Sequence, residues 1–456
     1  MGVIRWSGVF WVAFFLCGLS GCGTDSSGEA LSPEQLDAPD GSGDVTLPDG
    51  EAAGETSDGA VSDDMGPENS DSSEFISIIE SLGLTQYAGA ITPVEFSSEG
   101  NVTTYGFDSE EGPICMRGDD FLTGVRDTGS KNLVIFLQGG GACWSVFCLA
   151  VTGVTEGVPG VDILNPELEA NPTRDWNAVY VPYCDGSFFV GDAEHDDDIN
   201  GKGTRIHRGL ANLTGSYEVA SMRFPAPEKV LLAGSSGGAY GLLMAGALLR
   251  TYYPDTELII MADSGIGIAR EGDEEYIRKP LEEFNALRFI PEDCEGCLVT
   301  GHLTSLVGWF LKHDPQVRIG LFSSWYDSIL ADLFLQIPPE EFADSLQSQT
   351  DLIHAEYPER FRRFIKDGTQ HTALIADATG VIGTDIGKLE YPEDALGGLL
   401  NGGLIIGSLS DTEIEGVTMS QWLSDLLDNN LNGWVDLLEE RGPPPESSAE
   451  EGDETQ

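Results

Sequence analysis

A Gly-x-Ser-x-Gly pattern lies between an apolar run and a helix-like stretch, at Gly234-Ser-Ser236-Gly-Gly238. In a nucleophile elbow the serine sits in a sharp turn between a strand and a helix, and the glycines let these two elements approach each other. The serine hydroxyl then stands at the helix N-terminus, and the amide of Gly237 faces the oxyanion that forms when a carbonyl is attacked. We therefore predict Ser236 as a nucleophile for acyl transfer, since Ser235 lacks the first glycine at the required spacing.

A second glycine-rich segment follows an earlier apolar run. Gln138-Gly-Gly-Gly-Ala-Cys143 comes directly after Leu133–Leu137, where the HGGG-type loop of esterases supplies a further amide to the oxyanion. A phosphate-cradling loop is the alternative, but no Lys-Ser/Thr pair follows. We predict that the amides of Gly140, Gly141 and Gly237 form the oxyanion hole.

A serine nucleophile needs a base, and the base needs an acid, in the chain order Ser, Asp, His. Asp327 follows the second strand-like run after Ser236, which is the usual place for the acid, whereas Asp263, one run earlier, is expected to be a structural carboxylate. Of the two histidines beyond Asp327, His371 lies in a polar loop and His354 in a helix-like stretch. We predict Asp327 as the acid and His371 as the base.

Short apolar runs alternate with helix-like stretches over residues 75–440. Near-continuous apolar strands that alternate with helices indicate a parallel sheet covered on both faces. The expected fold is a single α/β domain, α/β-hydrolase-like, with a mainly parallel sheet. The expected strands are Leu133–Leu137, Ala178–Val181, Val230–Ala233, Leu258–Met261 and Val317–Phe322, and the expected helices include Gly238–Arg250 and Leu352–Lys366.

The 456 residues carry a formal net charge of −54, from 23 Lys and Arg against 77 Asp and Glu. Such a charge repels phosphate backbones and anionic head groups, so we expect no nucleic-acid partner and no electrostatic docking to membranes. Residues 23–74 and 441–456 are rich in Gly, Ser, Asp, Glu and Pro and lack an apolar period. Both segments are expected to be disordered, the first as an acidic tether and the second as an acidic tail.

Residues 1–22 place one arginine before an apolar run that is too short to span a bilayer, which is typical of a signal peptide. The run ends in Leu19-Ser-Gly-Cys22, which resembles the bacterial lipobox, where the cysteine is lipidated. We expect lipidation at Cys22, a lipid anchor as the sole membrane contact, and a place in the bacterial cell envelope. Gly23 is not the aspartate that retains lipoproteins at the inner membrane, so the outer membrane or cell surface is favoured.

Six cysteines remain beyond Cys22, and export to an oxidising compartment favours three disulfides. A redox role for the Cys-x-x-Cys at 294 is the alternative, but its acidic neighbours raise the pKa of a thiol and disfavour a reactive thiolate. Spacing favours two pairs and leaves the third: Cys143 with Cys148, Cys294 with Cys297, and Cys115 with Cys184.

The segment Asp428–Glu439 fits the EF-hand template D-x-[DN]-x-[DN]-G-x5-E. Its oxygen ligands suit calcium, which would be structural here. However, Arg441 and the prolines after it cut an exiting helix short, and no partner hand exists in the sequence. We therefore assign no metal site, and no cofactor is needed for the chemistry above.

Three blocks of the sequence resemble the pectin acetylesterases and the related animal carboxylesterase Notum. Leu137-Gln-Gly-Gly-Gly-Ala-Cys143 is similar to the family's LEGGGWC, Pro182-Tyr-Cys-Asp-Gly-Ser-Phe-Phe-Val-Gly-Asp192 to YCDGxSFxGD, and Gly234-Ser-Ser-Gly-Gly238 to GCSAGG. Their order and spacing fit, and the likeness extends from about Ile114 to Trp434. The YCDGS block is the most distinctive of the three.

The resemblance implies a carboxylic-ester hydrolase with Ser236, Asp327 and His371 at the triad positions, and it implies the Cys115–Cys184 pair. Ala142 stands where the family often has Trp, and Ser-Gly-Gly replaces Ser-Ala-Gly, so the acyl pocket is expected to differ in size. The family acts on acetyl esters of plant polysaccharide and on a long unsaturated acyl chain of a signalling protein. An acylated carbohydrate is the expected substrate. A long-chain deacylase, a surface-binding lipoprotein without turnover and a serine peptidase are the alternatives.

Overall fold

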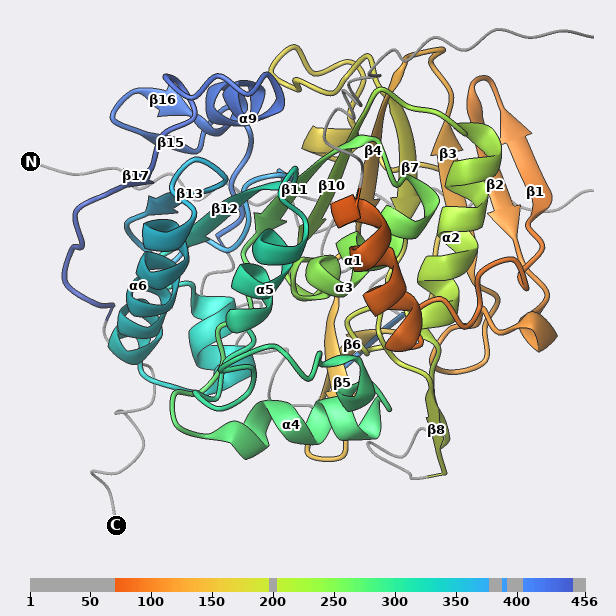
Figure 1. Cartoon of the computed structure of the whole chain (residues 1–456), viewed down its shortest axis with the longest axis horizontal. Helices are drawn as coiled ribbons and strands as arrows, with labels where there is room; N and C mark the ends of the chain where they lie inside the picture. The colour runs from red at the N-terminus through yellow and green to blue at the C-terminus, as the bar shows by residue number, and fades with distance from the viewer. Residues whose placement is uncertain (1–69, 197–202, 377–387, 392–404, 446–456) are drawn as a thin grey trace, which may run out of the picture. The chain divides into compact units, whose positions relative to one another are not determined.

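The computed structural model describes residues 70–196, 203–376, 388–391 and 405–445 (Figure 1). The predicted signal peptide, Cys22, most of the tether and the tail beyond residue 445 lie outside these ranges. The described residues cluster into one unit by their contacts. Within the described ranges, no helix has both the length and the apolar character needed to cross a bilayer.

In the part of the chain that the structure describes, ten strands form one central sheet. Its antiparallel edge consists of three strands that pair with one another and with the first strand of the parallel part. From there to the other edge every neighbouring pair is parallel, which confirms the predicted mainly parallel α/β fold. The order is β1 (Val94–Glu99), β2 (Val102–Gly106), β3 (Leu122–Arg126), β7 (Asn177–Val181), β4 (Asn132–Leu137), β10 (Lys229–Ser235), β11 (Glu257–Asp263), β12 (Arg318–Ser324), β13 (Phe361–Lys366) and β17 (Leu437–Leu438).

Alternate side chains of the strands pack into two separate hydrophobic cores, one on each face of the sheet. In β4, Leu133, Ile135 and Leu137 belong to one core, and Val134 and Phe136 belong to the other, as the side-chain alternation of a strand requires. Figure 1 shows α3, α5 and α6 on the viewer's side of the sheet. Helices of the first core include α2 (Gly209–Arg223), α3 (Gly237–Tyr252), α5 (Ser305–His313) and α6 (Pro339–Glu356), and α9 (Met419–Leu427) packs in the second.

The helix predicted over Leu352–Lys366 is wrong beyond Glu356. α6 ends at Glu356, and residues from Phe361 onward form β13, which pairs in parallel with β12. Pro358 disfavours the helical conformation in the residue before it, so the chain leaves the helix there. The apolar side chains of the following residues then enter the sheet instead of extending a helix face.

Both ends of the described chain are more ordered than expected. α1 (Ser70–Ser81) starts inside the predicted tether, and it buries Phe75 and Ile79, which are 2% and 0% exposed. An apolar pair four residues apart gives this short helix a face to bury. At the other end, the carbonyl oxygen of Gly442 accepts a hydrogen bond of 2.7 Å from the Tyr326 hydroxyl, so the first residues of the predicted tail are attached to the domain.

The structure contains the three expected disulfides, Cys115–Cys184, Cys143–Cys148 and Cys294–Cys297. Cys143 and Cys148 are directly opposite each other in the hairpin of β5 (Gly141–Trp144) and β6 (Phe147–Val151). The hairpin therefore holds the end of the glycine-rich loop. The other helices and strands are α4 (Glu274–Glu283), the π-helix η5 (Ile329–Leu335), the 3-10 helices η1 (Ser109–Glu111), η2 (Asp162–Leu164) and η4 (Leu287–Phe289), and the short strands β8 (Ala193–His195), β9 (Arg205–His207), β14 (Leu389–Glu390), β15 (Glu413–Ile414) and β16 (Val417–Thr418).

Candidate active site

Ser236 occupies the turn between β10 and α3 with a strained backbone. Its φ is 56° and its ψ is −123°, a conformation that non-glycine residues adopt at a cost of about 1–3 kcal/mol and that clusters at functional sites. Close approach explains the glycine two positions later, because a Cβ on Gly238 would lie 2.3 Å from the carbonyl oxygen of Leu137. The local geometry is that of the nucleophile elbow expected from the sequence.

The glycine-rich loop lies against the N-terminus of α3. A Cβ on Gly237 would lie 3.4 Å from the Gly141 nitrogen and 3.7 Å from the Gly140 nitrogen, so the three predicted oxyanion residues meet. Gly141 has a φ of 79°, and a Cβ there would lie 1.9 Å from the Leu149 carbonyl oxygen, so only glycine fits. Gln138 fixes the start of the loop, since its Oε1 accepts a 3.1 Å hydrogen bond from the amide of Tyr183.

The predicted acid and base are in contact. Both Asp327 carboxylate oxygens lie 2.9 Å from His371 Nδ1, and both side chains are fully buried. The His371 Nε2 atom is also buried, and it has no hydrogen-bond partner among the described residues. An Nδ1 that donates to the carboxylate leaves Nε2 as a proton acceptor. Because His371 and Ser236 line one cavity, this acceptor belongs to the same site as the serine hydroxyl.

Asp263 anchors the loop that carries His371. Its carboxylate accepts hydrogen bonds from the amides of Ala373, at 2.7 Å, and Leu374, at 3.2 Å, and from the Ser235 hydroxyl. Asp263 is fully buried, and this burial raises the pKa of its carboxyl to about 6. The residue expected to be a structural carboxylate thus joins the strand end beside Ser236 to the histidine loop.

Asp327 also holds the first turn of the π-helix η5, which forms one wall of the site. Its Oδ1 accepts the amides of Ile329 at 3.1 Å and Leu330 at 3.0 Å. The other end of η5 is held from the loop before α4 and from α4 itself, where Arg270 Nε donates to the Leu335 carbonyl at 2.7 Å and the Tyr276 hydroxyl donates to the Phe334 carbonyl. The acid is therefore fixed by the wall as well as by the histidine.

The cavity at Ser236, which we call the Ser236 cavity, is apolar apart from the predicted catalytic groups. The sequence indicated its polar members but missed its aromatic wall, because the wall residues come from separate elements and share no local pattern. The one usable signal was the Phe-Phe pair within the YCDGS block. The cavity is lined by Gly140, Gly141, Phe147, Leu149, Phe188, Ser236, Gly237, Tyr240, Ile329, Leu330, Leu333, Phe334 and His371.

The segment Asp428–Glu439 has a geometry unlike an EF-hand. Leu437–Leu438 form β17 where an exiting helix would begin, Asp436 pairs with Arg363 at 2.6 Å, and Glu439 accepts the amide of Asp367 at 2.9 Å. Both carboxylates already have protein partners, with which a calcium ion would have to compete.

Across the described ranges, one group of three side chains has metal-ligand spacing, namely Cys143, Cys148 and Glu390. The two cysteines are bonded to each other as a disulfide, so they are not thiolate ligands.

The comparisons with known proteins agree with the resemblance inferred from the three sequence blocks. Residues 109–284 match the pectinacetylesterase family model. The resemblance to this family is therefore confirmed. The matched residues include the glycine-rich loop and Ser236, whereas Asp327 and His371 lie outside them.

Curated relatives are similar to the chain at low identity. Pectin acetylesterase 4 of Arabidopsis thaliana is 25% identical over 176 residues, which cover 34% of this chain and 41% of the relative. Palmitoleoyl-protein carboxylesterase notum2 of Xenopus laevis is 26% identical over 263 residues, 50% and 51% of the two chains. Pectin acetylesterase 11 of Arabidopsis thaliana is 23% identical over 208 residues, which cover 40% of this chain and 52% of the relative. The chain thus spans about half, or less, of the length of these relatives.

Proposed function

We propose that this chain is a serine carboxylic-ester hydrolase that removes acetyl or other short acyl groups from a polysaccharide such as pectin. One observation carries the proposal. Ser236 in its strained turn and the Asp327-bound His371, whose Nε2 lacks a partner among the described residues, line one cavity, with the amides of Gly140, Gly141 and Gly237 beside them. The names of the curated relatives, pectin acetylesterase and palmitoleoyl-protein carboxylesterase, support the same reaction class.

The proposed reaction proceeds through an acyl-enzyme. His371 Nε2 takes the Ser236 proton as Oγ attacks the ester carbonyl, and the three glycine amides stabilise the oxyanion. The imidazolium, held by Asp327, then protonates the leaving alcohol. In the second half, His371 deprotonates a water molecule that attacks the acyl-enzyme, which releases the acid and restores Ser236. No metal or cofactor takes part in these steps.

The test is hydrolysis of p-nitrophenyl esters, from acetate to palmitate, by the protein and its Ser236→Ala variant. We expect turnover on short esters and a loss in the variant on the order of 10³ to 10⁶ in kcat, because the variant lacks the hydroxyl that attacks the ester carbonyl. A matched Ser235→Ala variant keeps the nucleophile and should retain most of the activity. Near-full activity of Ser236→Ala would refute the proposal, and amide substrates in the same assay distinguish a serine peptidase.

A long-chain deacylase is the second candidate, because the Ser236 cavity carries apolar side chains such as Leu149, Leu330 and Leu333. A rate maximum at palmitate would favour it. The third candidate is a surface-binding lipoprotein on a hydrolase fold, and the absence of turnover on every ester tested would favour that one.

We also propose that the chain is anchored in the bacterial cell envelope, at the outer membrane or the cell surface, by a lipid on Cys22. The support is the Leu-Ser-Gly-Cys pattern at the end of the apolar run. The acidic segment that follows would act as a spacer between anchor and domain. A Cys22→Ala variant should leave the membrane fraction, and its retention there would contradict the anchor.

A further inference from the structure

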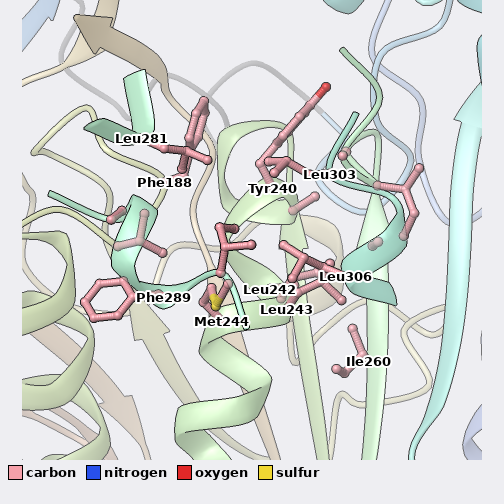
Figure 2. A pocket seen from close by; sticks show the side chains of 18 of the residues that line it. Phe188, Tyr240, Leu242, Leu243, Met244, Ile260, Leu281, Phe289, Leu303 and Leu306 are labelled. Atoms are coloured by element: carbon pink, nitrogen blue, oxygen red, sulfur yellow. The ribbon is translucent and has the colours of Figure 1, made fainter. Parts of the chain in front are cut away.

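A second apolar cavity lies behind the Ser236 cavity, between α3, β11 and α5. Figure 2 shows its side chains, with Phe188 and Tyr240 at one end and Ile260 at the other. Met244 and Leu306 also contribute to its walls. No charged side chain contributes to the lining, so the cavity suits hydrocarbon and disfavours water.

The two cavities share the side chains of Phe188 and Tyr240. These rings are stacked, with centroids 5.4 Å apart and an angle of 26° between their planes. Phe334 packs edge-on against both rings, at centroid distances of 6.0 Å and 5.6 Å. The Tyr240 hydroxyl donates to the Ile268 carbonyl at 2.5 Å, so this ring is fixed at both ends.

Neither cavity alone has room for a long chain. The Ser236 cavity has a volume of about 40 Å³ and the second cavity about 30 Å³. A cavity needs a volume of about 10–15 Å³ to hold one water molecule. Each of the two cavities therefore has room for only a few atoms. The space beside Ser236 therefore fits the methyl group of an acetyl ester better than an extended hydrocarbon.

We propose that Phe188 and Tyr240 form a partition that restricts the esterase to short acyl groups, and that the cavity behind them is a latent extension of the acyl site. This inference rests on the proposed function and names its acyl class. Phe188 is the movable half of the partition, because Tyr240 is tied by its hydroxyl while the Phe188 ring has apolar contacts alone. Removal of the Phe188 ring joins the two spaces into one apolar channel.

The test compares Phe188→Ala with the unchanged protein on p-nitrophenyl acetate, butyrate, octanoate and laurate. Each methylene that gains apolar room contributes about a fourfold gain in kcat/KM. We expect the octanoate-to-acetate ratio of kcat/KM to rise at least tenfold in Phe188→Ala. An unchanged ratio in this variant, or a preference for laurate in the unchanged protein, would overturn the proposal.

Phe189→Ala is the matched control. Phe189 also has a left-handed φ, 62° against 55° for Phe188, and both rings are buried, so the two variants carry similar costs in stability. Phe189 packs against Tyr183 and lines neither of the two cavities, and its variant should keep the original chain-length profile. Adding Ala262→Leu to Phe188→Ala refills the second cavity and should return the ratio toward its original value.

Dodecanoate binding, measured by calorimetry, gives the same comparison without turnover. Binding should be at least tenfold tighter to Phe188→Ala than to the unchanged protein and to Phe189→Ala. An equal affinity would overturn the partition even if no ester is hydrolysed, so its failure is distinct from failure of the proposed reaction. If Phe188→Ala does not fold, Phe188→Leu opens the same space at a smaller loss of packing.

Discussion

The two halves of the candidate site are built in different ways. The half that carries Ser236 is one contiguous piece of chain, β10 and α3, whose turn is shaped by close packing of its own glycines. The half that carries His371 has no such local frame. The His371 side chain is held by Asp327, which lies 44 residues earlier in the sequence. The loop backbone is held by Asp263, whose carboxylate accepts two loop amides that lie 110 and 111 residues later in the sequence. One half is thus determined by local sequence and the other by tertiary contacts.

This difference determines how each half should fail. A change at the elbow displaces backbone, because the crowding atoms are carbonyl oxygens of β4 and the loop after it. A change at the histidine loop leaves the backbone of the elbow intact and alters only the position or the protonation of one imidazole. Elbow variants should therefore lose stability and activity together, whereas loop variants should lose activity with a smaller loss of stability.

The largest effect that separates the two halves is expected for Asp327→Asn. Its Oδ1 can still accept the amides of Ile329 and Leu330, so η5 keeps its start. The new amide group, however, donates to His371 Nδ1 and forces the proton onto Nε2, where the imidazole can no longer accept the Ser236 proton. We expect kcat to fall by about 10⁴, as for a triad whose histidine has the wrong tautomer, with the melting temperature nearly unchanged.

Steady-state kinetics and thermal unfolding of Asp327→Asn measure both quantities. Asp332→Asn, one turn further along η5 and exposed, is the matched control and should retain its kcat. If Asp327→Asn retained more than a tenth of the original kcat, Asp327 would not be the acid that orients His371.

Gly238→Ala is expected to be the next largest perturbation, and it acts on the elbow. The added methyl would lie 2.3 Å from the Leu137 oxygen and 2.7 Å from the Gln138 oxygen, so the backbone that leads into the oxyanion loop must move. Overpacking of this kind costs about 1–3 kcal/mol of stability, and a displacement near 1 Å costs about 100-fold in rate. Urea unfolding and kinetics should therefore both show a loss.

Gly308→Ala provides the control for Gly238→Ala. Gly308 is also in a helix, but a Cβ there has no atom within 4 Å, so the substitution should stabilise the protein by about 0.5–1 kcal/mol. Equal stabilities of the two variants would show that the elbow is not crowded.

The same division separates what the sequence could predict from what it could not. The strands around Ser236 and the elbow itself were predictable, because long apolar runs and glycine spacing are local signals. β13 was misread as helix, since Phe361, Phe364 and Ile365 are spaced so that they also fit a helix face, and only pairing with β12 decides the matter. The aromatic wall needs Phe188, Tyr240 and Phe334 from three elements, which no local pattern brings together.

Asp263→Asn tests the tertiary half with the smallest expected effect. The asparagine oxygen can accept a hydrogen bond from one of the two loop amides. The NH2 group of the asparagine would face the other loop amide, and two donors cannot form a hydrogen bond. The loss of one hydrogen bond costs about 1–1.5 kcal/mol, and where all of it falls on the positioning of His371 in the transition state, kcat falls by at most about tenfold. KM should be unchanged, because Asp263 does not line the Ser236 cavity. Ser235→Ala removes only the hydroxyl donor to Asp263 and should lower kcat by less than about threefold.

The pH dependence of stability separates a buried carboxylate from a simple loss of packing at Asp263. Burial raises the pKa of this carboxyl from 3.8 to about 6, so between these pH values the native state binds a proton that the unfolded state has released. Stability from this group is therefore highest below pH 4 and falls as the pH rises through 6, by about 3 kcal/mol. Asparagine has no such titration, so the free energy of unfolding of the unchanged protein, relative to Asp263→Asn, should be larger at pH 4 than at pH 7. Equal differences at the two pH values, measured by urea unfolding, would show that Asp263 is not held as a buried carboxylate, and the anchoring of the histidine loop would need another cause.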